Sequence, residues 1–212
     1  MTVGVNLIGT MYLTHLLFEA VRKAPQGRII NVSSVGYILE HFVQIKTKDG
    51  ERGPEDFLVE RIRRKEDHYP FFVYAKTKLG VILFTQYLAK LIEQNNIKNL
   101  KVATLHPGSI ATDIYHPDSL FFNISRRIFY PILVLFLKSP RDGAQTTLCT
   151  ACMPFEELRS GAYYSECQYV PNLWKVAHPN HNEFFRRYVW NVCTEKISHL
   201  TGGEQIFSQL TK

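Results

Sequence analysis

The chain has 212 residues, of which 45% are hydrophobic and 21% are charged, and its formal net charge is +6. These values are typical of one globular domain with a sizeable buried core. The densest basic run, residues 61–65, is followed directly by Glu66 and Asp67. We interpret this run as a solvated face and expect no nucleic-acid partner. No basic segment typical of a signal peptide follows Met1, which favours an intracellular protein.

Hydrophobic periodicity predicts helices and strands that alternate along the chain. Helices are expected over Val3–Ala20, Glu55–Arg64, Leu79–Ile92, Gly143–Cys152 and Glu183–Lys196. Strands are expected over Arg28–Ser33, Leu100–Leu105 and Gly161–Ser165. This order of elements indicates an α/β fold.

The stretch Tyr74-Ala-Lys-Thr-Lys78 leads into a segment with apolar residues every four positions, Leu79, Leu83, Tyr87 and Leu91. This spacing predicts a helix with one buried stripe. Residues four apart share a helix face, so the Tyr74 hydroxyl and the Lys78 ammonium can point at one spot. A nearby cation favours the phenolate and lowers the pKa of a tyrosine. The pair is therefore a candidate general acid/base; the alternative is an exposed Tyr and Lys on an amphipathic helix.

Polar or turn-forming residues follow two of the expected strands. Ser34 follows the first strand, and His106-Pro107-Gly108 follows the second. Ligands of open α/β sheets bind at the carboxyl ends of the strands. Both positions are therefore candidates for a ligand site.

The four cysteines do not suggest a disulfide scaffold in a chain of this length. Cys149-Thr-Ala-Cys152 has C-x-x-C form, but no second pair completes a zinc site. We interpret both as buried thiols of a helix and expect no metal.

The most hydrophobic stretch, Ile128–Leu137, has ten residues and contains Pro131. A spanning helix needs about 20 apolar residues, so this segment is too short to cross a bilayer. It is compatible with peripheral membrane contact. The wider segment Phe121–Leu137 fits either a cover over an apolar substrate or ordinary core packing.

Three motifs in order resemble the short-chain dehydrogenase/reductase family: Asn-Val-Ser-Ser at 31–34, Tyr-x-x-x-Lys at 74–78 and His-Pro-Gly-x-x-x-Thr at 106–112. Further stretches resemble its retinol-dehydrogenase-like branch, namely Val5-Asn6-Leu-Ile-Gly9, Gly143-Ala-Gln-Thr146, Ser160-Gly-x-Tyr-Tyr-Ser165 and Arg186-Arg-Tyr-Val-Trp190. The resemblance covers nearly the whole chain.

The resemblance implies four catalytic residues. Tyr74 would be the general acid/base on the substrate oxygen, and Lys78 would lower the pKa of Tyr74 and hydrogen-bond the nicotinamide ribose. Ser34 would hold the substrate carbonyl or hydroxyl, with a simple strand-end cap as the alternative. Asn6 would fix a water that relays protons from Lys78, with a plain surface amide as the alternative.

The resemblance also implies a cofactor, NADP or NAD with NADP slightly preferred, bound by Tyr74, Lys78, Pro107, Gly108 and Thr112. Thr112 could instead be a helix N-cap, because Asp113 follows it. The implied reaction interconverts an alcohol and a carbonyl on a lipophilic small-molecule substrate. The implied location is the surface of the endoplasmic reticulum or of lipid droplets, otherwise the cytoplasm, and the oligomeric state stays open.

The chain departs from the family in two places. Residues 36–70 form an insertion between Ser34 and Tyr74 that could gate the site, dock a partner or be tolerated padding. None of the twelve glycines forms a G-x-x-x-G-x-G or G-x-G-x-x-G turn after a strand.

From the missing glycine turn we expect residues 1–212 to be a single partial domain, the C-terminal portion of a Rossmann-like doubly wound parallel sheet whose Gly-rich half is absent. Such a chain should bind NAD(P) weakly by itself. The alternative function is a catalytically inactive truncated product or a partner-binding module.

Overall fold

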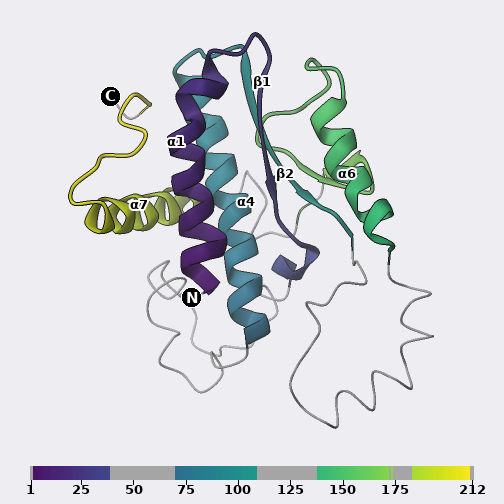
Figure 1. Cartoon of the computed structure of the whole chain (residues 1–212), viewed down its shortest axis with the longest axis horizontal. Helices are drawn as coiled ribbons and strands as arrows, with labels where there is room; N and C mark the ends of the chain where they lie inside the picture. The colour runs from purple at the N-terminus through teal and green to yellow at the C-terminus, as the bar shows by residue number, and fades with distance from the viewer. Residues whose placement is uncertain (1, 39–69, 109–137, 172, 174–182, 211–212) are drawn as a thin grey trace.

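The computed structural model describes residues 2–38, 70–108, 138–171, 173 and 183–210. These residues form a four-stranded sheet with helices on both faces (Figure 1). The strands are β1 (Gly27–Val32), β2 (Leu100–His106), β3 (Tyr163–Ser165) and β4 (Gln168–Tyr169). The helices are η1 (Gly4–Gly9), α1 (Thr10–Arg22), η2 (Val35–Tyr37), α4 (Pro70–Gln94), α6 (Pro140–Cys152) and α7 (Glu183–Leu200). The predicted α/β fold with a largely parallel sheet is confirmed.

The strand order is β1-β2-β3-β4, and only β4 runs antiparallel to its neighbour. β1 and β2 pair in parallel from Gly27 opposite Leu100 to Val32 opposite Leu105. The carboxyl ends of β1, β2 and β3 therefore meet at one edge of the sheet. β4 was not predicted, because its two residues are both exposed and carry no apolar alternation.

Two hydrophobic cores lie on opposite faces of the sheet. Along β2, Leu100 and Val102 belong to the core under α1, α4 and α7. Ala103 and Leu105 belong to the second core, which α6 covers from the other side (Figure 1). This alternation follows from the two-residue period of a strand.

The helix predicted over Leu79–Ile92 is present as α4, but the prediction of one buried stripe is wrong. Buried residues occur on every side of α4, including Val81, Ile82, Phe84 and Thr85. The reason is its central position, since α4 contacts β1, β2, η1, η2, α1 and α7. A helix packed on all sides loses the polar face that an amphipathic pattern requires.

The N-terminal helix begins with a π-helical stretch, η1, before continuing as α1. Leu7 of η1 is fully buried against Gly80 of α4. A Cβ added at Gly80 would lie only 2.7 Å from Leu7 Cδ2, so the glycine permits this close approach. The contact brings Asn6, the residue before Leu7, up to α4.

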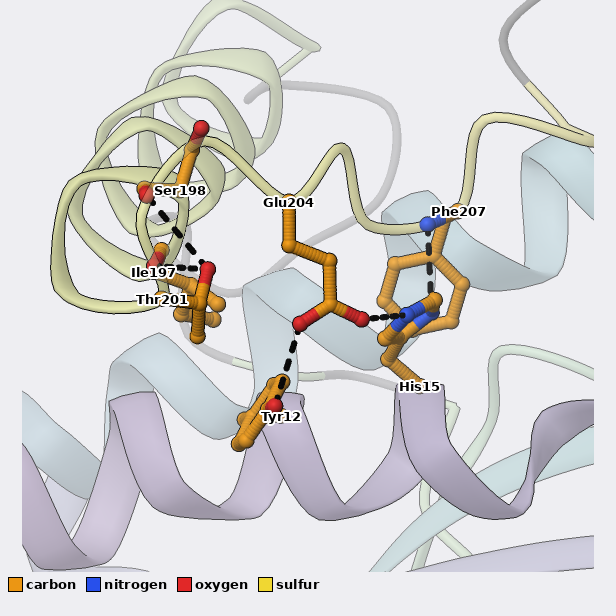
Figure 2. A network of polar contacts seen from close by, with 7 residues as sticks. All are labelled: Tyr12, His15, Ile197, Ser198, Thr201, Glu204 and Phe207. Carbon is orange, nitrogen blue, oxygen red and sulfur yellow. Dashed lines mark hydrogen bonds and ion pairs between the residues drawn. The ribbon is translucent and has the colours of Figure 1, made fainter.

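The segment after α7 folds back onto α1 through Glu204 (Figure 2). The Tyr12 hydroxyl donates to Glu204 Oε2 at 3.0 Å, and this hydrogen bond raises the pKa of Tyr12. His15 Nδ1 accepts the Phe207 N–H at 3.2 Å, so Nε2 carries the ring proton and donates to Glu204 Oε1 at 3.1 Å. The network holds the Phe207 ring in the core beside Phe18 and Trp190.

α6 begins with a serine cap, because Ser139 Oγ accepts the N–H of Asp142 at 3.2 Å. The interpretation of Cys149 and Cys152 as buried thiols is wrong. Cys149 is half-buried and Cys152 is exposed. α6 covers the sheet with Gly143, Thr146 and Thr150 instead.

Among the described helices, none is long and apolar enough to cross a membrane. Several predictions lie outside the described residues: the helix over Glu55–Arg64, the segments Phe121–Leu137 and Ile128–Leu137, Thr112, and nearly all of the 36–70 insertion.

Candidate active site

The two serines at the end of β1 face different surroundings. Ser33 is 2% exposed, and its hydroxyl donates to the Lys78 carbonyl at 2.8 Å. Ser34 is half-buried, and its Oγ accepts the N–H of Gly36 at 3.1 Å as the cap of η2. Asn31 and Ser33 are buried while Val32 is 45% exposed, so the period of a strand could have assigned the inward serine from sequence. Ser33 thus ties β1 to α4, whereas the Ser34 O–H donates to no acceptor among the described residues.

Tyr74 and Lys78 lie one turn apart near the start of α4, as the spacing predicted. The Lys78 ammonium is 5.5 Å from the centroid of the Tyr74 ring. Its Nζ donates to the Val32 carbonyl at 3.1 Å, at the end of β1. Burial lowers the pKa of Lys78. A half-buried cation beside a tyrosine ring is thus fixed at the carboxyl end of β1.

Ser34 and Tyr74 approach one another across Gly36. A Cβ added at Gly36 would lie 3.4 Å from Ser34 Oγ and 3.6 Å from Tyr74 Cε1. The serine hydroxyl and the tyrosine ring therefore both border the space that a side chain at Gly36 would fill. The structure brings together Ser34, Tyr74 and Lys78 at one edge of the sheet.

Asn6 reaches the same helix from η1. Its Nδ2 donates to Thr77 Oγ1 at 3.4 Å, and the Thr77 hydroxyl donates to the Tyr74 carbonyl at 2.7 Å. Thr77 precedes Lys78 in the chain and is fully buried. π-Helical turns are frequent at functional sites, and Asn6 lies within one.

Pro107 and Gly108 follow the end of β2 and are half-buried. Gly108 has φ +96°, a conformation that residues with a Cβ rarely adopt. The side chain of Lys138 lies over it, because an added Cβ would be 2.7 Å from Lys138 Cδ. Lys138 forms an ion pair with Glu166 of the β3–β4 turn.

His106 ends β2 beneath this ion pair. It is buried, and its Nδ1 has no hydrogen-bond partner among the described residues. Burial lowers the pKa of His106, while Glu166 acts to raise it and Lys138 to lower it. The end of β2 thus carries a buried histidine whose charged form is disfavoured, and the Lys138 side chain lies over the glycine that follows.

Two tyrosines beside Tyr74 were not predicted from sequence. The ring centroids of Tyr37 and Tyr163 are 5.6 Å apart in an edge-to-face contact. Burial raises the pKa of Tyr163, with further contributions from Tyr37 and Tyr74. The Tyr163 hydroxyl is buried without a hydrogen-bond partner among the described residues. It can therefore form a hydrogen bond with a bound molecule.

Comparison with known proteins identifies relatives along most of the chain. Retinol dehydrogenase 11 of Mus musculus is 31% identical and aligns with 93% of this chain and 54% of its own length. Retinol dehydrogenase 12 of Homo sapiens is 31% identical over 92% of this chain and 53% of its own length. Over this shared stretch the chain is therefore similar to retinol dehydrogenases.

The chain spans about half the length of these relatives. Dehydrogenase/reductase SDR family member 13 of Homo sapiens is 29% identical over 77% of this chain and 38% of its own length. No family model matches the sequence.

A solved structure, that of an uncharacterised protein from Mycobacterium paratuberculosis, matches with a TM-score of 0.57. It is 20% identical and covers 96% of this chain and 59% of its own. At this identity the match supports the fold alone. This chain therefore shares its α/β architecture with that protein.

Proposed function

We propose that this protein is an oxidoreductase that interconverts an alcohol and a carbonyl with a nicotinamide cofactor. The observation that carries the proposal is the convergence of Ser34, Tyr74 and Lys78 at the carboxyl end of β1. Parallel α/β sheets bind their ligands at this edge. Similarity to retinol dehydrogenases supports the same reaction class.

Tyr74 is the proposed proton donor and acceptor. In the reducing direction its O–H gives a proton to the substrate carbonyl oxygen as that oxygen gains charge. Lys78 stabilises the resulting phenolate, because its ammonium is held beside the Tyr74 ring. Among the described residues, the Val32 carbonyl accepts one of the three ammonium protons, and the other two have no acceptor there.

Ser34 is the proposed hydrogen-bond donor to the same substrate oxygen. Its Oγ accepts the Gly36 N–H, which directs the remaining O–H away from the backbone. A donor fixed in advance stabilises developing negative charge on oxygen without reorganising during the reaction. Asn6 is the proposed support of a proton-relay water, and its contact with Thr77 supports a place beside Lys78.

NADP or NAD would supply or accept the hydride. The residues fit the nicotinamide end of such a molecule. Lys78 has two ammonium protons that no described residue accepts, and Pro107 and Gly108 present backbone at the end of β2. Thr112, also proposed here, lies outside the described residues. No Gly-rich turn follows a strand in the sequence, so we expect these residues alone to bind the dinucleotide weakly.

We propose a retinoid or a similarly lipophilic molecule as the substrate. The support is that two of the relatives are named retinol dehydrogenases. Such substrates partition into membranes, which supports the surface of the endoplasmic reticulum or of lipid droplets as the place of action.

The proposal is tested by Tyr74→Phe with Tyr87→Phe as the matched control. Both changes remove one hydroxyl from α4, but Tyr87 packs on Trp190, with ring centroids 5.2 Å apart, away from Ser34. We expect Tyr74→Phe to lower kcat by about 10²–10⁴-fold with cofactor binding nearly unchanged, because only proton transfer is lost. Tyr87→Phe should keep its activity. Retained turnover in Tyr74→Phe would refute the role of Tyr74.

A non-catalytic binding module is the second candidate, and two features of the surface favour it. Leu13, Leu16 and Leu17 of α1 are 57%, 56% and 51% exposed. β1 is an edge strand of the described sheet, with backbone groups that a further strand can pair. If this is the function, the wild-type protein should show no turnover, and Tyr74→Phe should leave partner binding intact.

A further inference from the structure

Three thiols gather at the end of α6, away from the proposed catalytic residues. Cys149 Sγ lies 3.7 Å from the carbonyl oxygen of Cys167, which belongs to the β3–β4 turn. Cys152 follows one helical turn after Cys149 and is exposed. Cys149 of α6 and Cys167 of the β3–β4 turn are thus close to one another at the surface.

The conformation of the β3–β4 turn holds Cys167 in this position. Glu166 has φ 52° and Cys167 has φ 61°, so two residues with side chains adopt the left-handed conformation in succession. Such backbone costs free energy and persists only where surrounding contacts hold it. The ion pair between Glu166 and Lys138 is one such contact.

Metal binding does not account for the cluster. Within the part of the chain that the structure describes, no group of three or more His, Cys, Asp or Glu residues is arranged to hold a metal ion. Thiol–disulfide chemistry needs only two sulfurs in contact. Cys149 Sγ lies against the backbone of Cys167, so these two sulfurs are the ones placed to meet.

We propose that Cys149 and Cys167 form a reversible disulfide by exchange with a small-molecule disulfide such as glutathione disulfide. The exposed Cys167 thiolate attacks one glutathione sulfur, forming a mixed disulfide and releasing one glutathione thiolate. Cys149 then loses its proton and attacks the Cys167 sulfur, which releases the second glutathione. Two protein thiols are oxidised to one disulfide, and one glutathione disulfide is reduced to two glutathione molecules.

The order of the two steps follows from exposure and burial. Cys167 is exposed and is therefore open to the incoming disulfide, whereas Cys149 is half-buried. Burial and the neighbouring Cys167 and Cys152 thiols raise the pKa of Cys149, which reduces its thiolate fraction. Cys149 is therefore better placed for the second, intramolecular step, in which its partner is already in contact.

The disulfide would join α6 to the turn that carries Glu166. Glu166 pairs with Lys138, and the Lys138 side chain lies over Gly108 at the end of β2. Oxidation would therefore restrain the β3–β4 turn, and through Glu166 and Lys138 it would stabilise the end of β2 where Pro107 and Gly108 lie. We expect the oxidised protein to have a higher midpoint of thermal unfolding than the reduced protein.

The test is peptide mapping by mass spectrometry after the reduced protein is incubated with glutathione disulfide and its remaining thiols are alkylated. We expect a cross-link between the peptides that carry Cys149 and Cys167. The link should persist in Cys152→Ser and in Cys193→Ser, whose thiol is 1% exposed in the core. In Cys149→Ser it should be lost, leaving glutathione attached to Cys167.

Two results would overturn the proposal. One is a wild-type protein that carries glutathione on Cys152 and Cys167 but has no internal cross-link. The other is a cross-link that survives Cys149→Ser and disappears in Cys152→Ser, which would make Cys152 the partner of Cys167. Both results are measured on the wild-type protein or on single variants. The substituted cysteines are exposed or half-buried, so the variants should fold.

Discussion

Gly108 is the residue at which a single added methyl group should most directly test the backbone conformation at the end of β2. Its φ of +96° disfavours any Cβ, and the Lys138 side chain occupies the space that the Cβ would need. We expect Gly108→Ala to lower the free energy of unfolding by about 1–3 kcal/mol. The measurement is urea denaturation of both proteins.

Gly4→Ala is the matched control for Gly108→Ala. Gly4 lies in η1, its φ is not positive, and no atom lies within 4 Å of an added Cβ. Alanine there should be neutral or stabilising by up to about 1 kcal/mol, because it reduces the freedom of the unfolded chain. Equal effects of the two substitutions would contradict the account of Gly108.

His106 should make stability depend on pH in one direction. Because burial lowers the pKa of His106, the unfolded chain binds this proton at a higher pH than the folded protein. The contribution of neutral His106 is fully present above its ordinary pKa of about 6.5 and is lost as pH falls through its folded-state pKa.

We therefore expect the free energy of unfolding to fall more in wild type than in His106→Gln between about pH 7.5 and about pH 5. Urea denaturation at several pH values measures this difference. His106→Gln removes the titrating ring and keeps a polar side chain at the end of β2. The same fall in both proteins would contradict the account.

Residues in short motifs could be predicted from sequence, but their tertiary partners could not. Ser34, Tyr74 and Lys78 stand in motifs beside a strand end or at a helix start, so local order was enough to select them. Lys138 and Glu166 meet only because β3 and its turn pack beside β2. No local pattern records that contact.

At the scale of elements, the approach of η1 to α4 positions Asn6. Leu7 is fully buried, and a Cβ at Gly80 would overlap its side chain. We expect Leu7→Ala to cost about 2–5 kcal/mol through the cavity it leaves. Gly80→Ala should cost about 1–3 kcal/mol through overpacking, less a gain of up to about 1 kcal/mol in helix propensity.

The double variant separates this contact from unrelated effects. In Leu7→Ala/Gly80→Ala the smaller side chain makes room for the new methyl group, so the cost should be lower than the sum of the single costs by about 0.5–3 kcal/mol. Free energies of unfolding of the four proteins give this coupling. Additive costs would show that η1 and α4 do not pack as described.

The elements themselves were predictable where their pattern was strong. β1, β2 and the capped start of α6 each match a local signal, namely β-branched residues or a serine cap. The burial of α4 on all sides and the exposure of Cys152 were not predictable, because both depend on which elements surround a helix. Periodicity predicts a helix better than it predicts what that helix contacts.

At the scale of the molecule, the sheet brings the ends of β1 and β2 to one edge, and α4 carries Tyr74 and Lys78 to the same place. The order of the three motifs along the chain was enough to predict this meeting, because parallel strands place their carboxyl ends together. The substrate could not be predicted in this way, since Phe121–Leu137 carries no local signal for a particular molecule. The central claim is therefore the chemistry of this edge.

The most direct measurement follows the hydride itself. The protein, isolated from the cells that make it, is incubated with retinal and with NADPH or NADH deuterated at the transferable position. We expect deuterium in the retinol formed, and no labelled retinol when Tyr74→Phe is introduced at the gene's own locus. Unlabelled product, or no reduction of retinal or of other lipophilic carbonyls with either cofactor, would contradict the assignment of this edge as an oxidoreductase site.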